Sequence, residues 1–290
     1  MEPKEIQRFC QHLQARNYSP HTLENYARDL RLFFAPLDKD LAQVNWRDVD
    51  YFVQQQARAE LAATTINRRL NTLKHFFDYL VIEEQQLVTN PIKPSHFLRR
   101  GRPLPKKLAQ TQVKALFDKI THPLDHALCL LMLRCGLRVS EVAQMKLENI
   151  DWDQQSVLIE QGKGRKDRVV YLSADTVASL KECLALRPAF VPNGLFFWNR
   201  KRPQRALSAK GIQKKVERYA KAAGIKASCH NLRHTFASNL LEEGAEIMSV
   251  KELLGHSTLA ASERYAQLSN QRVKNVYLQT MQKVIEKTRV

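Results

Sequence analysis

The run Arg99-Arg100-Gly101-Arg102-Pro103-Leu104-Pro105-Lys106-Lys107 constrains the fold more than any other stretch of the chain. Five cations, two prolines and one glycine lie within nine residues, so this segment cannot bury a core and is expected to be extended. It predicts two domains, residues 1–95 and 109–290, joined by a basic linker over residues 96–108. A solvated linker would explain the composition, but the charge density favours a strap along a phosphate backbone, with an affinity that falls steeply with salt.

The charge of the whole chain also indicates a polyanionic partner. Lys and Arg number 46 against 29 Asp and Glu, which gives a formal net charge of +17 over 290 residues. A chain of this length can bury two cores, so the excess belongs to folded domains and favours nucleic acid above all. A basic protein with a merely solvated surface is the alternative, and the size of the excess argues against it.

Cysteine usage and the N-terminus predict the compartment. The five cysteines form no CxxC, which argues against a disulfide framework and against a zinc ribbon. No apolar stretch is long enough to cross a bilayer, and Met1–Glu5 is charged rather than the start of a signal peptide. We therefore expect a cytoplasmic protein with reduced cysteines and no membrane partner.

Residues 1–95 are predicted to be entirely helical. Ser19-Pro20 combines a capping hydroxyl with proline at the first helical position. Further helices are expected over residues 48–59 and from Thr64 or Thr65 onward. Apolar residues recur at helical spacing along the second and last of these segments, namely Leu23, Tyr26, Ala27, Leu30, Phe33 and Phe34, then Ile66, Leu70, Leu73, Phe76, Phe77 and Leu80.

The remaining faces of these helices carry cations and amides with few acids. For any one of these residues solvation is the ordinary role, and Asn67 is counted among the surface positions. The mixture as a whole favours contact with a DNA groove. We predict that DNA contacts come from the helices and the linker, through Arg28, Arg68, Lys74, Arg99, Arg100, Arg102, Lys106 and Lys107.

Residues 109–290 are predicted to be mainly helical with a small antiparallel sheet. Two strands, residues 156–160 and 168–172, flank a cation-rich hairpin turn that carries Gly162-Lys163-Gly164. Thr111 is expected to cap the first helix. Gly136 is expected to stop a strongly apolar second helix. The later helices are predicted at 138–147, 174–187, 208–223 and 270–287.

One constellation suits attack on a phosphodiester by a tyrosine oxygen. His230 and Arg233 are three residues apart, which places both on one face of a helix. With His256 and Tyr265 they supply a permanent cation, two imidazoles and a phenol. A free phenol has a pKa of about 10, so the nucleophile also needs neighbouring cations or an imidazole base.

Cleaving DNA without a metal further requires stabilisation of the pentacoordinate phosphate and a proton for the departing sugar oxygen. Arg138 and Arg233 suit the first task, because a guanidinium can bind two phosphate oxygens and stays charged. Lys163, at the tip of the hairpin, can act as the acid.

Taken singly, each of these residues also has an ordinary structural explanation. A lone tyrosine on a helix is usually core, and a lone histidine is usually structural. The group Cys229, His230, His234 and His256 suggests zinc, but its spacing matches no common zinc pattern. His234 is also placed on a different helical face from His230. No metal and no other cofactor are expected.

The order of the motifs carries a specific resemblance. The motifs are Gly136-Leu137-Arg138-Val139-Ser140-Glu141, Gly162-Lys163-Gly164, His230-Asn231-Leu232-Arg233-His234, Leu253-Leu254-Gly255-His256-Ser257 and then Tyr265. Together they resemble the tyrosine recombinase (phage integrase) family, and its small Xer-type members most closely. The resemblance implies a helical, SAM-like core-binding domain followed by an α+β catalytic domain.

The resemblance also implies roles for seven residues. Arg138 and Arg233 are similar to the family's catalytic arginines, and Lys163 to the hairpin lysine that protonates the 5′-oxygen. His230 and His256 are similar to the two catalytic histidines. Tyr265 is similar to the nucleophile that forms a 3′-phosphotyrosyl intermediate, and Glu141 to a supporting acidic position.

The implied enzyme cuts and rejoins DNA strands through a Holliday junction without metal or ATP. The implied assembly is a homo-tetramer on duplex core sites, with the C-terminal helix docked in trans on a neighbour. Xer proteins usually carry a His-Pro-Arg run near the C-terminus, whereas this chain has Thr280–Lys287 there. This difference favours a recombinase of a mobile element, acting in integration or resolution.

Three alternatives remain open. The first is Xer-type dimer resolution of a chromosome or plasmid. The second is a type IB topoisomerase, which the small first domain and the Xer-like motifs disfavour. The third is a catalytically idle DNA-binding protein, which the intact set of catalytic residue types argues against.

Overall fold

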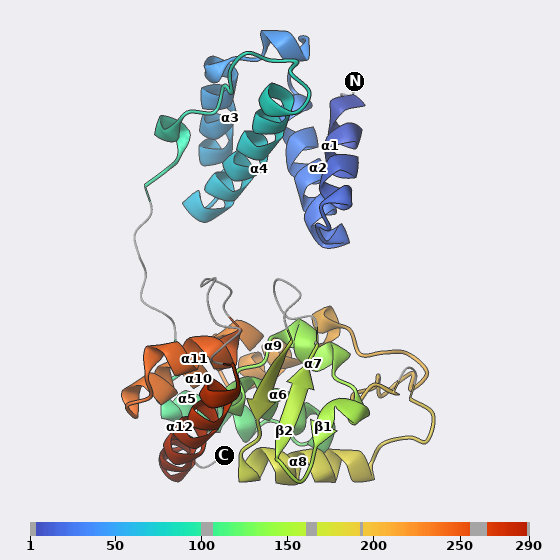
Figure 1. Ribbon diagram of the computed structural model, residues 1–290, viewed down its shortest axis with the longest axis vertical. Helices are drawn as coiled ribbons and strands as arrows, with labels where there is room; N and C mark the ends of the chain where they lie inside the picture. The colour runs from blue at the N-terminus through green and yellow to red at the C-terminus, as the bar shows by residue number, and fades with distance from the viewer. Residues whose placement is uncertain (1–3, 100–106, 161–166, 192–193, 256–265, 289–290) are drawn as a thin grey trace. The chain divides into compact units, whose positions relative to one another are not determined.

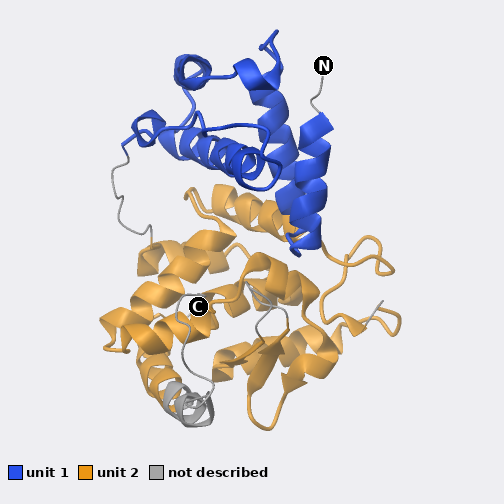
Figure 2. Cartoon of the chain, turned by 45° about the horizontal axis from the view of Figure 1, so that its top comes forward, with its two compact units in different colours: residues 1–103 blue, residues 104–290 orange. Residues whose placement is uncertain are grey.

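A computed structural model describes residues 4–99, 107–160, 167–191, 194–255 and 266–288, with side chains described from residue 275 onward in the last range. The chain divides into two compact units, Met1–Pro103 and Leu104–Val290 (Figure 2). Each unit has its own buried apolar core. None of the helices in these described ranges is long and apolar enough to cross a membrane.

Unit 1 is helical, as the sequence predicts. Its helices are α1 (Lys4–Ala15), α2 (Pro20–Phe34), α3 (Trp46–Arg58) and α4 (Ala63–Ile82), with 3-10 turns at Leu41–Gln43 and Pro94–His96 (Figure 1). The expected start of α2 is confirmed, since the Ser19 hydroxyl accepts a hydrogen bond of 3.2 Å from the Thr22 N–H. Helix α4 begins at Ala63, slightly before the predicted threonines.

The core of unit 1 is built from aromatic rings contributed by all four helices. Phe9, Phe33, Phe52, Phe76 and Phe77 meet edge to face, an arrangement that the ring quadrupoles favour. The predicted apolar positions of α4 are all buried.

Two buried polar side chains link the elements of unit 1. Asp29 on α2 is fully buried and accepts hydrogen bonds from Arg68 and Thr72 on α4. Asn67 is buried too, which corrects its expected surface position. Its amide bonds both backbone groups of Leu98, at 2.8 and 2.9 Å, and so fixes the segment that follows the helices. Such pairing offsets the cost of burying a charge or an amide.

Unit 2 is organised around α6 (Pro123–Arg134), which is buried nearly all round. A helix that is apolar on every side belongs in a core, and α8 (Ala174–Ala185) and α10 (Cys229–Glu242) pack against it. The other helices are α5 (Gln110–Phe117), α7 (Val139–Gln144), α9 (Ala209–Ala222), α11 (Ile247–Leu254) and α12 (Ala266–Lys287). Helix α5 follows Ala109, so the predicted cap at Thr111 is wrong.

The sheet of unit 2 has three antiparallel strands in the order β1-β2-β3. Strands β2 (Ser156–Ile159) and β3 (Arg168–Tyr171) are the predicted pair, in a register that places Val157 opposite Val170. Strand β1 (Ile150–Asp151) was not predicted, because two residues are too short to show an alternating pattern. Lys163 lies outside the described residues.

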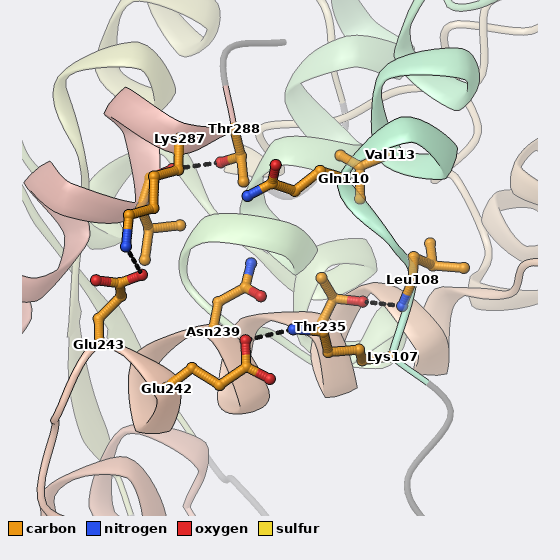
Figure 3. Close-up of a pocket in the computed structure, with 11 residues that line it drawn as sticks. Lys107, Leu108, Gln110, Val113, Thr235, Asn239, Glu242, Glu243, Lys287 and Thr288 are labelled. Carbon is orange, nitrogen blue, oxygen red and sulfur yellow. Dashed lines mark hydrogen bonds and ion pairs between the residues drawn. The ribbon is translucent and has the colours of Figure 1, made fainter.

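Helix α12 packs on its own unit. Tyr277, Met281 and Val284 are buried in a second apolar cluster with residues of α10 and α11. At its end, Thr288 accepts a hydrogen bond of 2.7 Å from Arg134, and Lys287 pairs with Glu243 at 2.6 Å. Figure 3 shows this end of α12 beside α10 and the start of unit 2.

Candidate active site

Arg138 and Glu141 lie at the start of α7 and hold each other. The chain turns sharply at Gly136, whose φ is +65°, and α7 begins two residues after Leu137. Glu141 accepts the backbone N–H of Arg138 at 2.7 Å and its Nη1 at 2.7 Å. The carboxylate therefore caps the helix and orients the guanidinium, which remains about a quarter exposed at 24%.

Arg233 lies in α10, one turn after a well-capped start. The Ser228 hydroxyl accepts the Asn231 N–H at 3.3 Å, and the Asn231 side chain accepts the Ser228 N–H at 3.0 Å. Arg233 is only 6% exposed. Its guanidinium donates to the carbonyl of Gly136 and, at 2.6 Å, to that of Leu254.

Burial and the nearby charge of Arg138 lower the pKa of Arg233 to about 10. The guanidinium thus stays charged at neutral pH.

Three guanidiniums converge on the C-terminal end of α11. Arg168 donates to the carbonyl of Leu253 at 3.0 Å, Arg233 to that of Leu254 at 2.6 Å, and Arg138 to that of Gly255 at 3.1 Å. These carbonyls have no partner within the helix and carry its negative dipole end. The end of α11 therefore gathers three cations at one place, immediately before His256 in the sequence.

Glu141 is the carboxylate within this group. Arg168 binds it with both terminal nitrogens, at 2.9 and 2.8 Å, in addition to the bonds from Arg138. Burial alone would raise the pKa of Glu141, but the hydrogen bonds and charges of Arg168 and Arg138 outweigh it and lower the pKa to about 2. With Glu141 ionised, three guanidiniums and one carboxylate leave an excess of positive charge, which suits a phosphate.

His230 lies in the first turn of α10 and is exposed. Burial of part of the ring, followed by the charges of His234 and Arg233, lowers its pKa below the usual value, so the imidazole is neutral at pH 7 and can accept a proton. The rings of His230 and His234 are 4.2 Å apart, centroid to centroid. The prediction that they occupy different faces is therefore wrong, because residues four apart on a helix are neighbours.

In the described ranges, no group of three or more His, Cys, Asp or Glu side chains is arranged to hold a metal ion. His256 and Tyr265, like Lys163, lie outside those ranges. The described half of the predicted catalytic set is Arg138, His230 and Arg233, and with Glu141 all come from α7 and α10.

Of the residues predicted to contact DNA, the structure describes some and not others. Arg28 donates to Asn25 at 2.6 Å, Lys74 pairs with Asp78 at 3.0 Å, and Arg68 pairs with Asp29 while its side chain stays 44% exposed. Lys107 pairs with Glu242 on α10 (Figure 3). Arg99 is exposed, and Arg100, Arg102 and Lys106 lie outside the described residues.

Sequence reasoning missed Arg168. It appeared only as the first residue of a predicted strand, and nothing in strand periodicity marks one of several cations near a hairpin as an internal ligand. The available signal was the alternation of the strand, which places Arg168 on the same face as Val170.

Known proteins resemble this chain over most of its length. The profile of the phage integrase family matches residues 106–272, and that of the phage integrase N-terminal SAM-like domain matches residues 6–84. Tyrosine recombinase XerC of Thermodesulfovibrio yellowstonii is 32% identical over 94% of this chain and 94% of its own length. Tyrosine recombinase XerC of Bacillus subtilis is 30% identical over 94% of each chain.

Solved structures share the fold at lower identity. A lambda integrase dimer bound to a COC′ core site has a TM-score of 0.71 at 18% identity, covering 90% of this chain and 98% of that one. The Tn1549 transposon integrase in complex with a circular intermediate DNA has a TM-score of 0.70 at 16% identity, covering 93% and 99%.

The fold and the family matches define a tyrosine recombinase: the chain belongs to the phage integrase family. It is a site-specific DNA recombinase, an enzyme whose curated relatives over nearly the full length include proteins of the Xer group.

Proposed function

We propose that Tyr265 attacks the scissile phosphate and forms a 3′-phosphotyrosyl bond while the 5′-oxygen leaves. The observation that carries this proposal is the convergence of Arg138 and Arg233 on the end of α11, at carbonyls ten and eleven residues before Tyr265 in the sequence. Guanidiniums fixed before the reaction stabilise developing charge without reorganisation, which is where most of the rate enhancement in such sites arises.

The remaining roles follow from protonation states. The lowered pKa of His230 keeps its imidazole neutral. The neutral ring can then accept the proton that the tyrosine hydroxyl loses. Lys163 gives its proton to the departing 5′-oxygen, and His256 supports the phosphate. The phosphotyrosyl bond conserves the energy of the broken phosphodiester, so rejoining needs neither ATP nor a metal.

The proposed partner is a duplex core site, bound by a homo-tetramer that exchanges strands through a Holliday junction. A solved lambda integrase tetramer of the same fold, with a TM-score of 0.67, is bound to a Holliday junction and supports this assembly. Because α12 packs on its own unit, docking in trans would replace the contacts of Tyr277, Met281 and Val284 with equivalent contacts on a neighbouring protomer.

Two biological roles fit this chemistry. The C-terminal sequence Thr280–Lys287 supports a mobile element, whereas relatives named XerC support dimer resolution. A substrate carrying the two ends of the host element and one carrying a chromosomal dimer site distinguish them by which one recombines.

The chemistry itself is tested by trapping the intermediate. Duplexes selected from a random pool by binding to the Tyr265→Phe protein are nicked near the centre, so that a cleaved strand diffuses away. Wild-type protein should form a covalent protein–DNA adduct, and Tyr265→Phe should bind equally well and form none. An adduct that persists in Tyr265→Phe, or no adduct with wild type on a bound site, would overturn the assignment. Exchange between two sites then excludes a topoisomerase.

A further inference from the structure

Arg168 is the third arginine of the cluster, and its guanidinium is used entirely within the protein. The side chain is 11% exposed. Nη1 and Nη2 grip the two oxygens of Glu141 at 2.9 and 2.8 Å, and Nε donates to the carbonyl of Leu253 at 3.0 Å. A planar fork satisfied in this bidentate way fixes the direction of the carboxylate as well as its charge.

The position of Arg168 in the chain makes it a junction of three segments. It begins β3, directly after the predicted hairpin that carries Lys163. Through Glu141 it reaches the start of α7 and therefore Arg138. Through Leu253 it reaches the last turn of α11, which leads to His256. A Cβ on Gly255 would lie 3.0 Å from both Cδ and Nη1 of Arg168, so the guanidinium is packed closely against that turn.

Arg138 and Arg168 both donate to the carboxylate of Glu141. Arginine–carboxylate pairs are frequently bidentate, with both ends of the guanidinium donating to the two oxygens. Here Arg168 takes the bidentate role, and the side chain of Arg138 gives Glu141 only Nη1, at 2.7 Å, while Nη2 bonds Gly255. Arg138 is therefore held by Glu141 and by the Gly255 carbonyl without a bidentate bond to the carboxylate. Its side chain is 24% exposed, against 11% for that of Arg168.

We propose that Arg168 is a positioning residue, which occupies Glu141 and the end of α11 and thereby aims Arg138 at the scissile phosphate. It touches no reacting atom. This inference rests on the proposed role of Arg138 in cleavage.

The test compares single-turnover cleavage by wild type, Arg168→Gln and Arg168→Lys on the nicked duplex described above. Arg168→Gln should bind DNA within about 3-fold of wild type and cleave roughly 100-fold more slowly, the size of loss expected when a reacting group is misplaced by about 1 Å. Arg168→Lys keeps the charge but not the fork, so it should recover only part of that loss. It also keeps the test usable if Arg168→Gln does not fold.

A duplex with a neutral methylphosphonate at the scissile position separates positioning from mere stability. Removing the phosphate charge reduces what Arg138 must stabilise, so the deficit of Arg168→Gln should shrink at least about 10-fold on that substrate. Lys215→Met is the matched control, because Lys215 pairs at 2.7 Å with the buried Asp125 of the same unit, whose other partners are Tyr219 and Arg200 rather than residues of the cluster. It should lose comparable thermal stability and cleave at the wild-type rate.

The outcomes are distinguishable. Equal deficits of Arg168→Gln on the phosphate and the methylphosphonate, or cleavage by that variant at the wild-type rate, overturn the positioning role while the proposed chemistry stands. Absence of a wild-type adduct instead overturns the proposed chemistry on which the inference rests.

Discussion

Glu141 is the carboxylate that pairs with two arginines of the cluster, and its charge state affects the stability of the fold. Its pKa in the folded protein is about 2, below the ordinary value for glutamate, so its ionised form stabilises the fold. That stability is present above the unfolded-state pKa and is lost as pH falls through the folded pKa. The shift corresponds to about 3 kcal/mol at neutral pH, as an upper estimate for a mostly buried group.

The substitution Glu141→Gln should therefore lower the free energy of unfolding at pH 7 by up to about 3 kcal/mol. The difference from wild type should narrow as the pH falls from about 5 to about 2, because wild type then protonates the same group. Urea denaturation at several pH values measures this. Glu148→Gln removes an exposed partner of Lys146 and should change stability little at any pH. A difference that is independent of pH would contradict the assignment.

At the scale of elements, the join between α6 and α7 leaves no room for a side chain at Gly136. Gly136 has a φ of +65°, and a Cβ there would lie 2.4 Å from Cδ1 of Phe236 on α10. Gly224, which ends α9, has a φ of +68° and open space around it. The two glycines therefore share backbone strain and differ in packing.

Gly224→Ala should destabilise the protein by about 1 kcal/mol, the cost of a left-handed alanine. Gly136→Ala should cost about 1–3 kcal/mol more, because Phe236 must move. It should also slow cleavage, since the Gly136 carbonyl accepts a hydrogen bond from Arg233. Calorimetry and the adduct assay measure the two effects. Equal melting temperatures for the two variants would refute the packing argument.

Elements with a clear period or a strong stop signal could be predicted from the sequence. The apolar spacing of α2 and α4, the stop at Gly136 and the pair β2 and β3 are all seen in the structure. The predictions that were wrong concern positions set by side-chain contacts, either local or long-range. The start of α5 uses Ala109 with the Gln112 side chain accepting its N–H at 3.0 Å, and Asn67 is buried because Leu98, 31 residues on, satisfies its amide.

The candidate site shows the same division. The residue types of the catalytic set could be predicted from the order of the motifs, because the reaction demands a phenol, imidazoles and guanidiniums. The role of Arg168 could not, since it depends on Glu141, 27 residues earlier, and on a helix end 85 residues later meeting one guanidinium. Periodicity describes each element separately and carries no information on which ends converge.

At the scale of the whole molecule, the net charge of +17 should appear as a steep dependence of DNA affinity on salt. The linker is where this charge is most concentrated. If Arg99, Arg100, Arg102 and Lys106 lie along phosphates, each contributes a slope of about 0.9 in log affinity against log salt. Replacing all four by glutamine in the Tyr265→Phe background should therefore reduce the slope by roughly 3 to 4.

A control variant must remove the same charge from elsewhere. Four surface cations that already pair with carboxylates provide it, namely Arg8, Arg16, Lys146 and Lys287. Their replacement by glutamine changes the net charge equally but removes no proposed phosphate contact, so the slope should change by less than about 1. Equal slopes for the two variants would mean that the linker acts only through total charge, and the strap along the backbone would have to be abandoned.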